Sequence, residues 1–272
     1  SHRYFKQEEL KKFMTREIKE RLIQEIIQKK EFSQLPRKDV EIAFSHFEKK
    51  PVSDEEKVRL TRQLLHKVFG AFGSRKLLIL KNKGEEWILK KHLSTRERLP
   101  YYKDIYKRIL IGFPKKISII DLGAGVNGFS YRYFEEIGFD VDYTGIEAMG
   151  QFVKLINAYF KKERIKGNAI HASLFELQNL KKIINEAKKP RVVFLFKVID
   201  SLEMLKKDYS KELILEISSL ADRLVVSFAT ESMIKRKKFA VKRTWFFEFL
   251  KKNFSILDDF EIAGERYIVF KR

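Results

Sequence analysis

Cysteine is absent from the 272 residues of this chain. Its absence excludes disulfide bonds, thiolate zinc sites and a cysteine nucleophile. Long apolar runs are absent as well: no segment reaches the roughly 20 residues that a membrane-spanning helix needs, and no secretory signal is visible. Histidine and carboxylate residues nowhere cluster with the spacing of metal ligands. We therefore expect a cytoplasmic protein with no membrane contact and no metal site.

Acidic residues are outnumbered by basic ones. The chain has 37 Asp and Glu against 57 Lys and Arg, which gives a formal net charge of +20. A surplus of this size exceeds what solubility requires, so it predicts attraction to a polyanion, most simply nucleic acid. The frequent Lys, Glu and Ile beside few side-chain amides are a compositional hint of a hot-growing source.

Glycine is scarce, with 12 residues, and three of them lie in one segment. Residues 118–128 (SIIDLGAGVNG) combine an apolar run, an acid and a glycine-rich turn, and residues 129–136 continue with a helical pattern. This order predicts a strand, a tight turn and a helix, which open a nucleotide-binding βαβ unit. The spacing of Gly123, Gly125 and Gly128 also fits a dinucleotide fingerprint, so the turn alone does not identify the ligand.

Two acids at consecutive strand ends narrow the choice of ligand. Asp121 would compete with a pyrophosphate for the helix amides, whereas it suits the sulfonium and ammonium groups of S-adenosylmethionine. Glu147 follows the next apolar run, 141–146, where a carboxylate can accept hydrogen bonds from two ribose hydroxyls. Both cofactor classes carry a ribose, so Glu147 supports a nucleoside and not a particular one. The alternative is that both acids only cap turns.

Apolar runs and helical patterns alternate from residue 117 onward. This alternation predicts an α/β fold with the Rossmann-like seven-stranded sheet of class I methyltransferases, in which ligands bind at the carboxyl ends of the strands. The expected strands are residues 117–122, 141–146, 168–171, 191–197, 223–228, and a closing antiparallel pair at 255–261 and 265–270.

The first 93 residues differ in character from the remainder. Helical periodicity covers residues 4–30 and 38–49, and the capping box Ser53–Glu56 opens a further helix that runs to about Phe69. Residues 76–89 fit either short strands or one more helix. We expect residues 1–93 to form a helical, basic domain that docks on RNA or the ribosome, and residues 94–272 to form the S-adenosylmethionine-dependent methyltransferase domain.

Four segments together resemble one family, the aminoglycoside-resistance methyltransferases that modify a guanine in small-subunit ribosomal RNA. The segments are HLSTRERL (92–99), DLGAGVN (121–127), FKVIDSLE (196–203) and VSFATES (226–232). The resemblance runs from about residue 90 to the end of the chain. It implies an enzyme that uses S-adenosylmethionine to methylate a base nitrogen of small-subunit ribosomal RNA, either naked or in the assembled small subunit.

The resemblance also implies roles at the cofactor site. Arg96 would pair with the carboxylate of the cofactor's methionine moiety, and Glu147 would hold the ribose. Ser173 stands where the family tends to have an acid, so its hydroxyl would serve as the acceptor beside the adenine. The full set of implied cofactor-binding residues is Arg96, Asp121, Gly123, Ala124, Gly125, Glu147, Ser173, Leu174 and Phe196.

The candidate catalytic residues are Lys197, Asp200, Ser227 and Phe228, and the resemblance implies all of them except Asp200. Lys197 would face the target base, while Ser227 and Phe228 would lie beside the flipped-out base, with Phe228 as a stacking platform. Asp200 departs from the family, which usually has proline or another uncharged residue there, and Ala229 replaces a proline.

The target nitrogen stays open between two possibilities. Guanine N7 has a free lone pair and needs little acid–base help, whereas the exocyclic amine of cytosine would gain from an acceptor such as Asp200. Against the amine, the Asp/Asn-Pro-Pro-aromatic signature of amino methyltransferases is missing, and Asp200 could simply cap a helix. The missing cysteine removes the cysteine-dependent route to carbon 5 of a pyrimidine.

A basic run follows the fifth expected strand, on the side of the base pocket. Lys235, Arg236, Lys237, Lys238 and Arg243 are predicted to clamp RNA phosphates. Two alternatives to the ribosomal assignment remain: a transfer-RNA base methyltransferase, and a non-catalytic RNA-binding factor for ribosome assembly.

Overall fold

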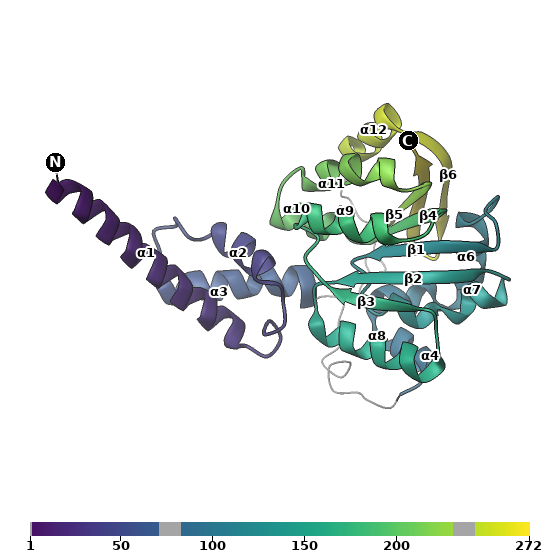
Figure 1. The fold of residues 1–272 in the computed structure, drawn as a ribbon, viewed down its shortest axis with the longest axis horizontal. Helices are drawn as coiled ribbons and strands as arrows, with labels where there is room; N and C mark the ends of the chain where they lie inside the picture. Colours follow the sequence, from purple (N-terminus) through teal and green to yellow (C-terminus); the bar gives the residue numbers. More distant parts are fainter. Residues whose placement is uncertain (1, 71–82, 231–242) are drawn as a thin grey trace.

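The centre of the molecule is a seven-stranded sheet with the order β3-β2-β1-β4-β5-β7-β6 (Figure 1). The computed structural model describes residues 2–70, 83–230 and 243–272, with no side-chain description for 2–7 and 9–14. Strands β1 to β5 are parallel, β7 runs antiparallel to β5, and β6 runs antiparallel to β7. The strands are β1 (Lys116–Leu122), β2 (Asp140–Glu147), β3 (Gly167–His171), β4 (Arg191–Phe196), β5 (Arg223–Ala229), β6 (Ser255–Ile262) and β7 (Glu265–Lys271). The predicted fold class is confirmed. Both ends of each predicted strand lie within one residue of the observed ends.

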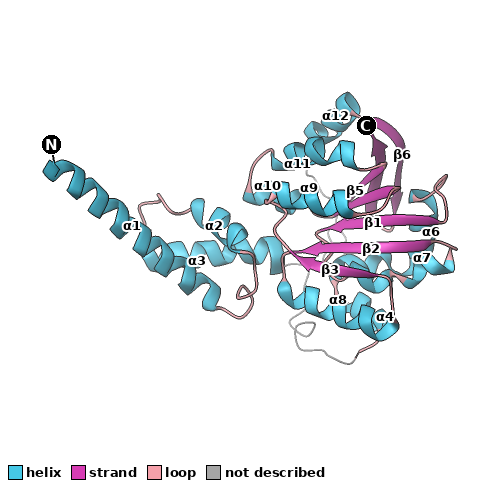
Figure 2. Ribbon diagram, viewed as in Figure 1, coloured by secondary structure: helices cyan, strands magenta, loops and turns pink. Residues whose placement is uncertain are grey.

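Helices cover both faces of the sheet (Figure 2). Because side chains alternate along a strand, Ile119 of β1 enters the core under one helical layer and Ile120 enters the other. The first layer holds α4 (Glu85–Lys91), α6 (Tyr102–Ile109), α7 (Arg132–Glu136) and α8 (Gly150–Glu163). The second layer holds α9 (Leu177–Glu186), α10 (Ile199–Leu205), α11 (Tyr209–Ile217) and α12 (Thr244–Asn253).

The amino-terminal helices extend from one end of the sheet (Figure 1). They are α1 (His2–Gln28), α2 (Arg37–Ser45), α3 (Asp54–Leu65) and the π-helical turn η1 (His66–Gly70). The Ser53 hydroxyl caps α3 by accepting a hydrogen bond from the Glu56 amide at 3.2 Å. The Glu56 carboxylate binds Arg59 instead of closing the capping box. Residues 85–91 form a helix, and residues 76–80 lie outside the described part of the chain.

Two of these amino-terminal elements, α2 and η1, lie against the part of the molecule that contains the sheet. Both α2 and η1 contact α10, and the His46 ring lies 2.7 Å from the carbonyl oxygen of Leu205. The contact places α2 and η1 at the carboxyl ends of the parallel strands. The division into domains at residues 93 and 94 stays a prediction. Among the helices that the structure describes, none is long and apolar enough to cross a membrane.

Candidate active site

A cavity lies at the carboxyl edge of the parallel strands, where the order of the strands reverses between β1 and β4. This is the position at which open α/β sheets bind ligands. The turn after β1, the loops after β2 and β3, and the start of the loop after β4 each contribute to its wall. Helix α2 and turn η1 cover it from the amino-terminal side. Lining residues include Asp39, Phe69, His92, Arg98, Asp121, Gly123, Ala124, Gly125, Glu147, Leu174, Phe196 and Lys197.

The glycine turn forms the floor of this cavity. Gly123 and Gly125 have φ angles of +72° and +53°, in the region that favours glycine. A Cβ on Gly123 would lie 2.7 Å from Cγ2 of Val198, and one on Gly125 would lie 3.3 Å from the ring of His92. A side chain at either position would therefore collide with neighbouring residues, which explains the glycines of this turn.

Gly123→Ala is expected to lower the free energy of unfolding by about 2–4 kcal/mol, because the φ angle and the contact with Val198 both oppose a side chain. The matched control is Gly112→Ala: Gly112 has a φ of +83°, but a Cβ added there would meet no atom within 4 Å, so only backbone strain of about 1–2 kcal/mol applies. Urea unfolding of both variants measures the difference. Equal losses would contradict a crowded turn.

Two buried carboxylates face the cavity beside this turn. Asp121 accepts hydrogen bonds on Oδ2 from Asn127 and Tyr143, each at 2.8 Å. Glu147 accepts from the Gly125 amide at 2.7 Å on one oxygen and from the Met149 amide at 2.8 Å on the other. Burial raises the pKa of both carboxyls above their usual values. Each Glu147 oxygen keeps a second lone pair, which suits a pair of ligand hydroxyls.

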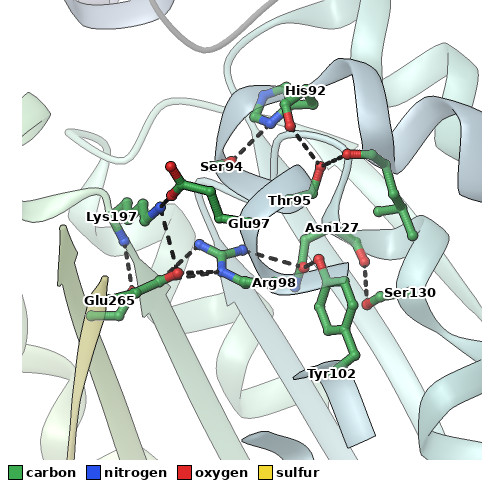
Figure 3. A network of polar contacts seen from close by, with 12 residues as sticks. His92, Ser94, Thr95, Glu97, Arg98, Tyr102, Asn127, Ser130, Lys197 and Glu265 are labelled. Carbon is green, nitrogen blue, oxygen red and sulfur yellow. Dashed lines mark hydrogen bonds and ion pairs between the residues drawn. The ribbon is translucent and has the colours of Figure 1, made fainter. Parts of the chain in front are cut away.

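A buried network of charges lies beside Asp121, to which Asn127 connects it (Figure 3). Arg98 makes a bidentate pair with Glu265, with Nε to Oε2 at 2.9 Å and Nη2 to Oε1 at 3.0 Å. The Lys197 ammonium lies 2.8 Å from Glu97 and 3.5 Å from Glu265. Burial raises the pKa of Glu265, but the charges of Arg98 and Lys197 outweigh it and leave that pKa below the usual value. The network thus holds two cations in fixed positions at the cavity.

His92 lines the same cavity and is uncharged. Burial lowers the pKa of its imidazole to about 3, and the nearby positive charges of Arg98 and Lys197 add to the shift. Its Nδ1 lies 2.8 Å from the Ser94 hydroxyl. His92 therefore contributes a neutral ring beside Gly125 and no titration near neutral pH.

Arg96 and Arg98 differ in position, although both belong to α5 (Leu93–Arg98). Arg96, predicted to bind the cofactor, is exposed and does not line the cavity, whereas Arg98 is 3% exposed and does. Residues two apart on a helix point about 200° away from each other, so only one of the two can face inward. The structure thus brings Arg98, and not Arg96, to the predicted site.

The residues predicted around the target base are only partly brought together. Lys197 lines the cavity, but Ser227 is fully buried beneath it, where its hydroxyl donates to Glu265. The Phe228 ring is 2% exposed, with the rings of Phe246 and Phe247 against its edges. In this arrangement Phe228 is covered and offers no stacking face to the cavity.

Asp200 and Arg243, predicted separately as acceptor and phosphate ligand, are paired with each other. Nη2 of Arg243 lies 2.6 Å from Oδ2 of Asp200, and the same guanidinium stands 4.9 Å from the centre of the Phe228 ring. Asp200 is exposed and does not line the cavity. Lys235, Arg236, Lys237 and Lys238 lie outside the described residues.

Comparison with known proteins connects this geometry to a family. The sequence model of the ribosomal RNA methyltransferase (FmrO) family matches residues 79–269. The chain belongs to this family. A 16S rRNA (guanine(1405)-N(7))-methyltransferase of Proteus mirabilis is 37% identical over 78 residues, which is 26% of this chain and 28% of that relative. The matched segment thus spans less than a third of the length of that relative.

Solved structures share the fold of this FmrO-family chain. The 16S rRNA methylase RmtB superposes with a TM-score of 0.73 at 19% identity, over 93% of this chain and 98% of that one. The methyltransferase RmtF in complex with S-adenosyl-L-homocysteine gives 0.73 at 22% identity, over 93% and 97%. Both likenesses include the amino-terminal helices, since they cover nearly the whole chain.

The residues present fit S-adenosylmethionine. Gly123 and Gly125 line the cavity without side chains, so a ligand can approach their backbone closely, and the buried Asp121 and Glu147 offer acceptors to a cation and to a ribose. The Asp39 Oδ2 atom, buried without a hydrogen-bond partner among the described residues, adds a further acceptor at the same cavity. No group of three or more potential metal ligands occurs among the residues that the structure describes.

Sequence reasoning missed several residues of this site: Asp39, Glu97, Arg98, Asn127 and Glu265. Glu97 and Arg98 could have been predicted, because they belong to the same Ser-Thr-Arg-Glu-Arg segment from which Arg96 was predicted. Asn127 likewise belongs to the quoted segment 121–127. Asp39 and Glu265 come from distant parts of the chain, and nothing in their local sequence marks them.

Proposed function

We propose that this chain transfers a methyl group from S-adenosylmethionine to N7 of a guanine in small-subunit ribosomal RNA. The observation that carries the proposal is the cavity at the strand ends, which combines a glycine cradle with two buried acids inside the segment that matches the FmrO family. The net charge of +20 supports an RNA substrate. Such an enzyme would act in the cytoplasm, where ribosomes are.

The pairing of Asp200 favours guanine N7 over an exocyclic amine. An amine needs a nearby acceptor for its hydrogens, but both Asp200 oxygens bind the guanidinium of Arg243. The N7 atom needs no such help. Its lone pair forms the new N–C bond while the S–C bond breaks with its electron pair staying on sulfur, so the positive charge passes to the guanine ring and no proton leaves.

The protein's contribution would then be binding and positioning. S-Adenosylmethionine supplies an electrophilic methyl group on a sulfonium. We assign Glu147 to the ribose hydroxyls, Asp121 to the positive end of the ligand, and Arg98, instead of Arg96, to its carboxylate. Lys197, fixed between Glu97 and Glu265, would border the target base. Holding the two reactants in line supplies most of the rate in such a transfer.

The amino-terminal helices would select the substrate. We propose that residues 1–93 dock the enzyme on the small subunit through contacts with phosphates, which set position rather than sequence. This assignment favours the assembled subunit over naked RNA. The basic residues 235–238 would add a second contact beside the base pocket, and Phe228 could stack on the base only after Arg243 moves from its ring.

The decisive assay uses tritiated S-adenosylmethionine with three substrates: small ribosomal subunits, naked small-subunit RNA and transfer RNA. Mass spectrometry then identifies the labelled nucleoside. We expect 7-methylguanosine from the small subunit. Methylated cytidine would contradict the assignment to guanine N7 and would support Asp200 as the acceptor for an exocyclic amine. Label found only in transfer RNA would exclude the ribosomal assignment. No label, together with no cofactor binding by calorimetry, would support a non-catalytic assembly factor.

A further inference from the structure

Asp39 is a carboxylate that the amino-terminal helices bring to the cavity. It belongs to the first turn of α2, lines the cavity, and is 2% exposed. Its carboxyl lies near the hydroxyl of Ser173, which is fully buried just after β3 and lowers the pKa of Asp39. Its Oδ2 atom makes no hydrogen bond within the described part of the chain. The position therefore holds a buried acceptor in the wall of the cavity, without a partner among the described residues.

Such an acceptor is costly in the empty protein. A buried oxygen without a donor loses its hydration and gains nothing in return. Burial raises the pKa of the Asp39 carboxyl to about 7, and the negative charges of Glu147 and Glu176 add to the rise. A donor that enters the cavity would remove this penalty, so the side chain is placed to recognise a hydrogen-bond donor of the ligand.

The order of the strands indicates which part of the ligand lies there. Asp121 follows β1, Glu147 follows β2, and Ser173 follows β3, and neighbouring strands are about 4.8 Å apart. If Asp121 faces the cationic end of the ligand and Glu147 holds its ribose, the base must lie further along the same line, at the end of β3. Asp39 stands over that end of the cavity through its contact with Ser173.

We propose that Asp39 accepts a hydrogen bond from the 6-amino group of the cofactor's adenine, an inference that rests on the proposed function. Ser173, predicted from the sequence as the adenine acceptor, then holds the Asp39 carboxylate in place instead. The adenine specificity of the site is thus supplied by the amino-terminal helices, and a bound cofactor joins these helices to the catalytic domain.

The test compares two ligands by calorimetry: S-adenosylhomocysteine and S-inosylhomocysteine, in which a carbonyl oxygen replaces the 6-amino group. At about pH 8.5, above the raised pKa of Asp39, the wild type should bind the inosine analogue about 10- to 100-fold more weakly, because the ionised carboxylate and the carbonyl oxygen are both acceptors. In Asp39→Asn the amide group can donate to that oxygen, so the preference should shrink to about threefold or less. Asparagine keeps the size of the side chain and suits a first helical turn.

The matched control is Glu41→Gln, which removes a carboxylate from the same helix at a position that does not line the cavity. It should leave both affinities and their ratio unchanged. Equal binding of the two ligands by the wild type, or an equal loss of both in Asp39→Asn, would overturn the proposal and leave Asp39 a purely structural residue. If the wild type binds neither ligand, the proposed function itself fails.

Discussion

Glu265→Gln should lower the free energy of unfolding by about 3–5 kcal/mol, because it leaves the buried guanidinium of Arg98 without its counter-charge. The two side chains are 3% and 1% exposed, so water cannot replace the lost carboxylate. In thermal unfolding, a loss of this size corresponds to a fall in Tm of about 10 °C for a chain of this length. The double variant Arg98→Leu/Glu265→Leu should recover much of the loss, since it removes both charges together.

The control for this prediction is an ion pair at the surface of the same hairpin. Asp259 pairs with Arg266 at 2.7 Å, but these side chains are 38% and 32% exposed. Asp259→Asn should therefore cost at most about 1 kcal/mol, and salt should screen that effect. The buried pair should be almost insensitive to salt. Similar losses in the two single variants would contradict a buried, uncompensated charge.

The pH dependence of the Glu265→Gln effect has a definite sign. The pKa of Glu265 is lower in the folded protein than its ordinary value of 4.5. Its ionised form therefore stabilises the fold above pH 4.5, and this contribution is lost as the pH falls below that value through the lowered pKa. The difference in free energy of unfolding between the wild type and Glu265→Gln should thus be largest at neutral pH and should decrease in acid.

The central strands were predictable because a parallel strand with helices on both faces is buried and mainly apolar. The segment 191–196 illustrates this: every residue is buried, and the apolar run marks the strand in the sequence. The glycine turn was predictable for a similar reason, since its residue types follow from local backbone geometry. Local rules of this kind identified Asp121 and Glu147 at the strand ends.

The missing parts of the site depend on contacts between distant segments. The choice between Arg96 and Arg98 requires the rotation of a short helix, which its neighbours set and its own sequence does not. Asp39 reaches the cavity only because α2 packs on α10. The pairing of Asp200 with Arg243 joins positions 43 residues apart. Charge pairs of this kind leave no periodic signal, so sequence reasoning gave the two partners separate roles.

Asp121→Asn is expected to weaken binding of S-adenosylmethionine by about 30- to 1000-fold without lowering the stability of the ligand-free protein. Asn127 and Tyr143 both donate to one Asp121 oxygen, so the asparagine oxygen will take that place and turn its NH₂ group toward the cavity. A donor then faces the positive end of the ligand where a carboxylate stood, and the loss of a buried charge pair has this magnitude. Calorimetry and thermal unfolding measure the two effects.

Stability should not fall in Asp121→Asn, because burial raises the pKa of Asp121 in the folded protein. An acid with a raised folded pKa destabilises the fold increasingly as the pH rises above its unfolded pKa, so removing its charge at neutral pH relieves a cost. The matched control is Asp142→Asn on the adjacent strand, whose side chain is 38% exposed and does not line the cavity. That variant should bind the cofactor like the wild type.

The loss of affinity in Asp121→Asn, measured for two ligands, shows which positive group of the cofactor Asp121 contacts. S-Adenosylmethionine carries a sulfonium and an ammonium group, whereas S-adenosylhomocysteine carries only the ammonium. A larger loss for S-adenosylmethionine would place Asp121 beside the sulfonium, where it would also resist the movement of positive charge onto guanine. Equal losses would place it beside the ammonium, where it only binds. Unchanged affinity for both ligands would remove Asp121 from the site and require a different anion to balance the cofactor's charge.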